Sequence, residues 1–368
     1  MFEFNKYYFL IIFLFTSLFM VSCDDEGKGG QQNKDSNSTM QKARGESGEV
    51  ILVIPPSLWE SELGDLLREV FTSNVKVLPQ DERLYDIKPV DPSKFNSVFK
   101  ASQNLMFVAT LDNQNPEGKY MKRYFTENSL NQIEKNPDLF SFEQEDVYAR
   151  GQDVLYLFGR NEKELIKNIN ENKAGLKEFF NEKETERLVS SFKKTAEKGI
   201  MNYIEDSLNL ELIIPIGFDI AKKSDDFIWL RELDSKEEFN IWVVKMPYND
   251  ESVFDPKNIK SFRNSLGKKY ITDKDIPDLH LTSQDELDFV IDTVNLNNQY
   301  ALRIKGLWKY SDSSRGGAFV SYLFANEDSG ELYYLEGYLD APGESKREPM
   351  RRLKAILGTA KLPQSIKD

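Results

Sequence analysis

Residues 7–21 near the start of the chain form a predominantly apolar run, which contains no charged side chain. A membrane-spanning helix usually needs about 20 apolar residues, whereas the apolar core of a secretory signal peptide is shorter. The run ends at Cys23, and residues 24–48 include few apolar side chains. Such a segment buries too little apolar surface to fold. We therefore expect a signal peptide over residues 1–22 and a flexible tether over residues 23–48.

Periodic patterns over residues 49–205 predict a first unit that mixes helices and strands. Apolar side chains recur at helical spacing after Ser57, which we expect to cap that helix. Asn161 with Glu164 three residues later indicates another helix start. Asn181 and Glu184 repeat this spacing, so two consecutive helices and one helix broken near Asn181 both stay open. Strands are expected over residues 50–54, 75–78, 105–111 and 153–158.

Longer alternating patterns over residues 206–368 predict a second unit. Residues 300–309 place Tyr300 and Trp308 on one face and charged side chains on the other, as expected of a half-buried antiparallel strand. Residues 326–330 are typical of a hairpin loop. Helices are expected over residues 256–267 and after Ser345, which with Glu348 is expected to cap the last helix. Further strands are expected over residues 210–215, 227–233, 239–246, 318–325 and 331–339.

The two patterns together predict the α+β class. We expect two tandem units of mostly antiparallel sheet with helices packed on the sheet faces.

Charge and composition narrow the function. The chain has 61 acidic against 48 basic residues and a net charge of -13, which disfavours binding to nucleic acid. With one histidine, His280, and one cysteine, no multi-histidine or thiolate metal site can form, and we expect no metal and no cofactor. Nucleotide-binding glycine motifs do not occur. His280 is interpreted as structural or surface-exposed, so only chemistry based on Asp and Glu stays open.

The cysteine that ends the apolar run indicates covalent attachment of lipid. Met20-Val21-Ser22-Cys23 resembles a lipobox, in which a peptidase cuts before a lipidated cysteine, although Met20 departs from the usual Leu. We expect lipid on Cys23 to anchor the protein to the outer membrane. Asp24-Asp25-Glu26 resembles a surface-export signal of some Bacteroidota lipoproteins, so the periplasmic face and the cell surface both stay open.

Several short motifs in the body resemble a family of Bacteroidota lipoproteins described only as a domain of unknown function. The chain departs from the family pattern at Gln103 and Arg315. The order of elements in the second unit is also similar to that of PsbP-like αβα sandwiches, which implies a binding or assembly module. The motifs are Leu78-Pro79-Gln80, Asp86-Ile87, Asn104-Leu105, Gly306-Leu307-Trp308, Gly316-Gly317, Ala341-Pro342-Gly343 and Lys346-Arg347.

Exposed-looking residues in these motifs and in the first helix are the candidate contacts with a ligand or partner. Each also has a structural interpretation: an aromatic residue packs in the core, a glutamine bonds the backbone, and a glycine permits a turn. Arg347, Arg351 and Lys354 form a basic stripe on the last helix, suited to an anionic partner or to solvent. The candidates are Trp59, Gln80, Trp308, Gly316, Gly317, Arg347 and Arg351.

These features favour a cell-envelope lipoprotein that is not an enzyme and that binds or assembles with an envelope protein or glycan. The alternative is a carboxylate-dependent glycan hydrolase, which needs two facing carboxyl groups in a deep cleft.

Overall fold

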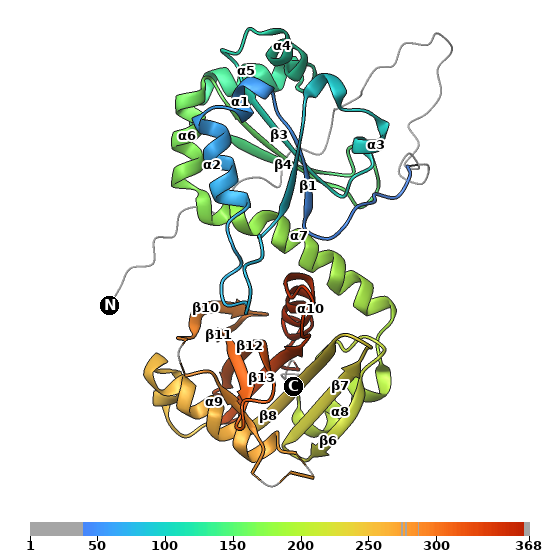
Figure 1. Cartoon of the computed structure of the whole chain (residues 1–368), viewed down its shortest axis with the longest axis vertical. Helices are drawn as coiled ribbons and strands as arrows, with labels where there is room; N and C mark the ends of the chain where they lie inside the picture. The colour runs from blue at the N-terminus through green and yellow to red at the C-terminus, as the bar shows by residue number, and fades with distance from the viewer. Residues whose placement is uncertain (1–39, 274, 277, 286, 364–368) are drawn as a thin grey trace. The chain divides into compact units, whose positions relative to one another are not determined.

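The computed structural model describes residues 40–363 except 274, 277 and 286 (Figure 1). Cys23 and most of the expected tether therefore lie outside the described residues. The described chain contains one five-stranded and one eight-stranded sheet with helices on their faces. The predicted α+β class is confirmed.

The five-stranded sheet has the strand order β2-β1-β3-β5-β4. Three of its pairings, β1 with β2, β1 with β3, and β3 with β5, are parallel, and only β4 runs antiparallel to its neighbour β5. The expectation of a mostly antiparallel first sheet was therefore wrong. Its strands are β1 (Glu49–Val53), β2 (Asp86–Val90), β3 (Asn104–Thr110), β4 (Ser141–Glu145) and β5 (Asp153–Gly159).

Continuous apolar strands explain the parallel arrangement. All residues of β3 and β5 are buried, because each face of this sheet has its own core. Parallel sheets covered by helices on both faces show this pattern, whereas a sheet with one wet face alternates. One core includes Leu66 of α2 and Phe180 of α7, and the other includes Met121 of α4 and Ile133 of α5.

The helices of this region differ from the expectation at several points. Asn161 caps α6 as predicted, because its side chain accepts a hydrogen bond from the backbone N–H of Glu164. The helix break falls at Asn172 rather than Asn181. Ser57 lies inside α1 and caps no helix, and residues 75–78 form a turn with Val77 at positive φ instead of a strand. The helices are α1 (Pro56–Trp59), α2 (Glu62–Phe71), α3 (Ser97–Lys100), α4 (Pro116–Met121), α5 (Glu127–Lys135), α6 (Glu162–Glu171) and α7 (Lys173–Lys194), with 3-10 helices at Pro92–Lys94 and Lys122–Tyr124.

The eight-stranded sheet is antiparallel throughout, as predicted for the second unit. Its main path runs β10-β11-β12-β13-β8-β7-β6, and β9 pairs with β11. The hairpin loop at residues 326–330 joins β12 to β13 as expected, whereas residues 210–215 form only isolated bridges. The strands are β6 (Asp219–Ser224), β7 (Phe227–Leu233), β8 (Glu238–Pro247), β9 (Leu281–Ser283), β10 (Val290–Leu296), β11 (Gln299–Tyr310), β12 (Gly316–Asn326) and β13 (Glu331–Asp340).

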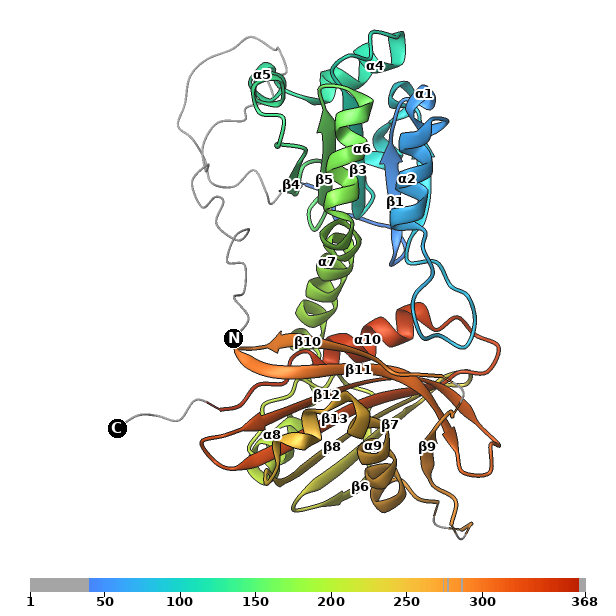
Figure 2. The same cartoon turned by 90° about the vertical axis from the view of Figure 1, so that its left-hand side faces the viewer.

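Helices cover both faces of this sheet, with α10 and α9 on opposite faces (Figure 2). The α10 face also receives α8, whose Ile200 and Ile204 pack beside the α7 residue Phe192. Helix α8 begins before the boundary expected at residues 205 and 206 and contributes its apolar side to this core. The bounds are α8 (Lys198–Leu208), η4 (Glu251–Phe254), α9 (Pro256–Tyr270) and α10 (Arg347–Leu357).

A buried ion pair fixes α9 on the sheet. Arg263 of α9 donates from Nε and Nη2 to the carboxylate of Glu336 on β13, at 2.9 and 2.6 Å. Both side chains are almost completely buried. Such a pair specifies the position of the helix because either partner alone would leave a buried charge.

Candidate functional site

Two of the predicted candidates, Trp308 and Gly317, form part of the sheet. The buried indole of Trp308 donates from Nε1 to the carbonyl oxygen of Leu339 at 3.0 Å. A Cβ atom on Gly317 would lie 2.2 Å from that oxygen and 2.9 Å from the indole nitrogen. Gly317 thus allows a close approach of backbone and indole within the protein. Gly316 is exposed at the start of the same strand.

Trp59 and Gln80 are also held by neighbouring groups of the chain. The ring of half-buried Trp59 packs against one core, and the Arg68 guanidinium lies 4.3 Å from its centroid. The exposed amide of Gln80 donates to the carbonyl oxygen of Glu344 at 3.0 Å. The bonding of Gln80 to backbone follows the structural interpretation given above.

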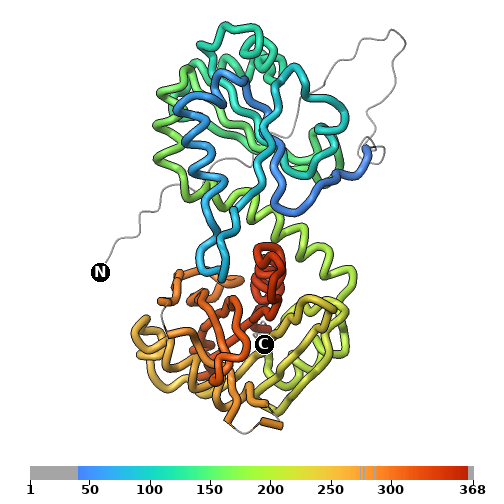
Figure 3. The backbone as a smooth tube through the Cα atoms, in the orientation of Figure 1, coloured from blue at the N-terminus to red at the C-terminus, as the bar shows by residue number. Residues whose placement is uncertain are grey.

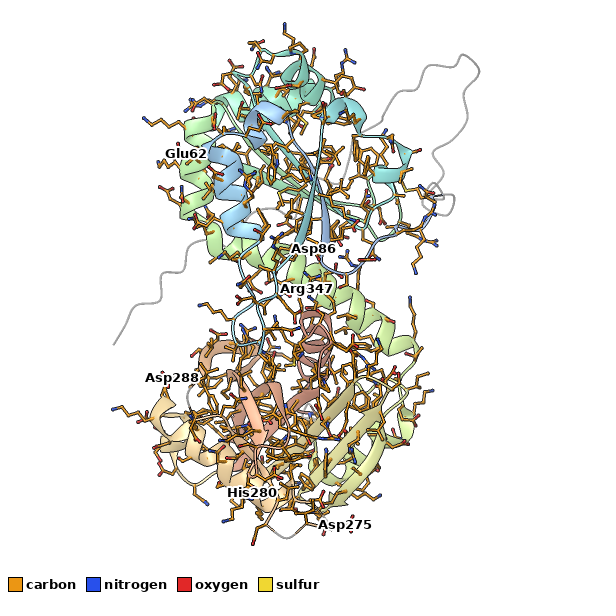
Figure 4. The ribbon with its side chains drawn as sticks, in the orientation of Figure 1. Glu62, Asp86, Asp275, His280, Asp288 and Arg347 are labelled. Atoms are coloured by element: carbon orange, nitrogen blue, oxygen red, sulfur yellow. The ribbon has the colours of Figure 1, made fainter. Side chains whose placement is uncertain are left out.

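The basic stripe of α10 is turned toward the rest of the protein. Arg347 donates to Asp86 at 2.8 Å, and the two side chains carry labels in Figure 4. Arg351 is buried and donates to Asn181 of α7 at 3.2 Å. Burial lowers the pKa of Lys354 to about 8. The positive charges of Arg303, Lys305 and Arg351 act in the same direction, and the nearby Glu178 acts against it. A solvated helix face is therefore contradicted at Arg351.

The start of α10 is capped from a distant part of the sequence. Glu82, in the loop between α2 and β2 that Figure 3 traces, accepts the backbone N–H groups of Lys346 and Arg347 at 2.7 and 2.9 Å. Although burial opposes it, these bonds and the hydroxyl of Ser345 hold the pKa of Glu82 below its usual value. The expected Ser345 cap was wrong, because Ser345 itself donates to Glu82.

A partly buried carboxylate network lies beside this cap. The Ser47 hydroxyl is within hydrogen-bond distance of both Glu184 of α7 and Glu348 of α10. Glu184 also accepts from the backbone of Gly48 at 3.1 Å and from Asn104 at 2.9 Å. Burial raises the pKa of Glu184, but Arg187, Asn104 and Gly48 outweigh burial and hold this pKa below its usual value. An anion so stabilised is a poor general acid.

A second pair of facing carboxyl groups occurs on the eight-stranded sheet. Glu238 and Asp340 lie directly opposite each other on β8 and β13. Arg315 Nη1 bridges them, 3.5 Å from Glu238 and 3.0 Å from Asp340, and Arg231 also donates to Glu238. Burial raises the pKa of Asp340 although Arg315 lowers it. Of the two carboxyl pairs, this one more closely resembles the acid and base of a glycosidase. The Arg315 guanidinium, however, contacts both carboxyl groups.

His280 lies apart from the two carboxyl pairs described above. Its Nδ1 lies 2.7 Å from the carbonyl oxygen of Asp278, in the exposed segment before β9 (Figure 4). Within residues 40–363, leaving out the three undescribed positions, no three His, Cys, Asp or Glu side chains gather as metal ligands. The same described residues include no helix both long and apolar enough to span a membrane.

A pocket of about 460 Å³ lies at one end of the eight-stranded sheet, and we call it the aromatic–acidic pocket. Its residues come from four places: the segment after β8, the 3-10 helix η4, the start of β11, and the end of β12 with the turn that follows. They are Tyr248, Glu251, Phe254, Gln299, Tyr300, Ala325, Asn326, Glu327 and Asp328.

Three aromatic rings form the walls of this pocket. The ring centroids of Tyr248 and Phe254 are 6.0 Å apart with planes at 76°, and those of Phe254 and Tyr300 are 5.9 Å apart with planes at 68°. Phe254 and Tyr248 also pack against the core below, whereas Tyr300 is 60% exposed. The pocket thus offers an accessible aromatic surface on a packed support.

The polar side of the pocket is acidic. Glu251, Glu327 and Asp328 are exposed, and the ion pairs found among the described residues include none of them. Burial, followed by the negative charges of Glu251, Glu327 and Asp250, raises the pKa of Tyr248. Gln299 and Asn326 add amide groups. The arrangement can bind a ligand through its aromatic rings, carboxylates and amides.

Sequence reasoning did not find this pocket. Tyr300 was assigned to the buried face of its strand, yet it lies next to the strand end and is 60% exposed. The turn at residues 326–330 was predicted as a hairpin loop but not as part of a site. The one available signal was the density of Asp and Glu next to Tyr248 and Phe254.

Two family models match the chain, and both are described as domains of unknown function. DUF8532 matches residues 43–193, and DUF4837 matches residues 197–359. Each match spans less than half of the 368 residues. The matches agree with the expectation of an uncharacterised family.

Solved structures resemble the chain only in part. No curated protein matches the chain. Solved structures with partial similarity include a point mutant of the protein Mog1, at 14% identity and a TM-score of 0.28 over 42% of this chain and 90% of Mog1. The Ran-binding protein Mog1p of Saccharomyces cerevisiae gives 14% and 0.27 over the same shares. LpqN, involved in cell envelope biogenesis of Mycobacterium tuberculosis, gives 13% and 0.26 over 41% of this chain and 81% of LpqN. At these TM-scores the similarities carry no argument about function.

Proposed function

We propose that the chain is a Bacteroidota-type lipoprotein, held at the outer membrane by lipid on Cys23, whose body is a non-catalytic binding or assembly module for an envelope protein or glycan. The aromatic–acidic pocket is the observation that carries this proposal. It combines an exposed tyrosine with several uncommitted polar side chains on a packed base, which is typical of binding sites. The resemblance of the second unit to PsbP-like modules stays a prediction.

The alternative, a glycan hydrolase that uses two carboxyl groups, is less well supported. Each of the two carboxyl pairs described above contains a glutamate bound by arginine. Glu184 is bound by Arg187, and Glu238 is bound by Arg231 and Arg315. A general acid must hold its proton near neutral pH, and neighbouring guanidinium groups favour the ionised form.

Crosslinking in the native envelope tests the binding function. A photo-crosslinking amino acid at position 300 of the full-length protein is expected to capture one envelope component, identified by mass spectrometry and recovered again in the reciprocal pull-down. The same probe at Val98, which is 75% exposed on the other part of the chain, is the control. Equal adducts at both positions would reject the pocket as a binding site.

The hydrolase alternative has its own readout. Purified full-length protein is expected to release no reducing ends from envelope glycans. Release that disappears in Glu238→Gln and persists in the remote variant Glu205→Gln would replace the binding function with catalysis.

A further inference from the structure

We propose that the aromatic–acidic pocket binds an organic cation, namely an ammonium or guanidinium group on an aliphatic stem such as a lysine or arginine side chain of a partner. This inference rests on the proposed function and names the chemical class that the pocket recognises.

The charges around the pocket favour a positively charged ligand. Three carboxylates, of Glu251, Glu327 and Asp328, line it, and its lining includes no lysine or arginine. A phosphate or carboxylate ligand would face like charges with no compensating cation, which is unfavourable in a partly desolvated site. A cationic ligand instead gains an opposite charge on more than one side.

The aromatic walls select an organic cation over a hydrated metal ion. Rings set at steep angles and about 6 Å apart present π faces and edges around one space, as in sites that recognise alkylated ammonium groups. Tyr300 is open to an incoming group, whereas Phe254 is supported from below. The aliphatic stem of the ligand would contact the rings while its charged end lies near the carboxylates.

The pocket is held in shape before any ligand arrives. Asp250 caps η4 by accepting the backbone N–H of Ser252 at 2.8 Å, and Asp255 caps α9 through the N–H of Lys257 at 3.0 Å. The backbone N–H of Tyr248 donates to the carbonyl oxygen of Gly330 at 2.8 Å, which ties the segment between β8 and η4 to the hairpin turn. A preformed site loses less conformational entropy on binding.

Isothermal titration calorimetry on the detergent-solubilised full-length protein tests this inference. The probes are a blocked tripeptide with a central lysine, free spermidine, and neutral maltotriose. The peptide and spermidine are expected to bind, more weakly as salt is raised, and maltotriose is not. Binding of the peptide but not of spermidine would assign the cation to a protein partner, and the reverse would assign it to a free polyamine.

Two matched double variants test whether binding depends on the carboxylates of the pocket or on the net charge of the protein. Glu327→Gln/Asp328→Asn is expected to weaken cation binding about tenfold or more. Glu205→Gln/Asp206→Asn changes the same Glu-Asp-Ser sequence at exposed positions of α8, removes the same charge, and is expected to leave binding within about twofold. Tyr300→Ala is expected to weaken binding and Tyr300→Phe to preserve it, because the phenyl face remains. Unchanged melting curves would show that all variants fold.

The outcomes distinguish this inference from the proposed function. Equal loss of binding in both double variants, or binding of maltotriose alone, would overturn the cation site while the binding function stands. If neither cation binds but the crosslink at position 300 persists, the ligand is of another class. The absence of both would reject the function together with its ligand.

Discussion

Gly317 permits close packing in the eight-stranded sheet because its side chain is a single hydrogen atom. Its α-carbon leaves room for the bond between the Trp308 indole and the Leu339 carbonyl oxygen. Gly317→Ala is expected to destabilise the protein by about 1–3 kcal/mol, because backbone must move. Gly175→Ala, where nothing lies within 4 Å of the added methyl group, is expected to stabilise α7 by up to about 1 kcal/mol. Urea unfolding measures both, and equal midpoints for the two variants would contradict this account.

Lys354 gives a pH-dependent contribution whose sign follows from its lowered pKa. Burial and the cations Arg303, Lys305 and Arg351 act against the charged form, and Glu178 favours it. The folded pKa of about 8 lies below the unfolded value of about 10.4. Below pH 8 the ammonium therefore destabilises the fold, and this cost disappears as pH rises through 8 to about 10.4.

Lys354→Met is accordingly expected to be more stable than the parent at pH 7, by about 1–3 kcal/mol, and nearly equal to it at pH 10.5. Unfolding in urea at several pH values gives the difference. Lys167→Met, at a side chain 70% exposed, is the control and is expected to differ little at any pH. A difference for Lys354→Met that stays constant over this range would show that the ammonium does not titrate as described.

At the scale of elements, the sequence was informative where charged residues alternate with apolar ones or where a turn has characteristic residues. The alternation of charged and apolar residues predicted β11, and the turn residues between β12 and β13 predicted that hairpin and its antiparallel pairing. Strands β12 and β13 are nevertheless buried almost throughout. Strands β3 and β5, buried on both faces, show no alternation, so their apolar runs gave the strands but not their direction. Short elements such as β9 and α4 are set by tertiary contacts and carry too few residues to show a period.

Site prediction failed for a related physical reason. The rings of Tyr248, Phe254 and Tyr300 come from separate elements, and only strand register and the caps of η4 bring them together. The basic residues of α10 were visible as a helical stripe, but the groups that cover Arg351 lie about 170 and 300 positions earlier in the chain. Local patterns identify which residues share a face of a helix, but they do not show which distant parts of the chain cover that face.

At the scale of the whole molecule, lipid attachment is expected to depend on one thiol. Cys23→Ser removes the group to which diacylglycerol is added, so the protein is expected to persist as an unprocessed precursor without the mass of the acyl chains. Mass spectrometry of the intact protein and of its amino-terminal peptide provides the measurement. Ser36→Ala, in the expected tether, is the control, and normal maturation of Cys23→Ser would end the lipoprotein proposal.

The hydrogen bond between Ser47 and Glu348 joins residues 301 positions apart. A chain made from its amino terminus presents Ser47 and Glu184 long before α10 exists, so this partly buried carboxylate network closes only when synthesis is almost complete. Contacts of such sequence separation form late, after the entropy of a long loop has been lost. For the exported lipoprotein proposed above, which would cross a membrane as an open chain, late closure of this network would delay completion of the fold.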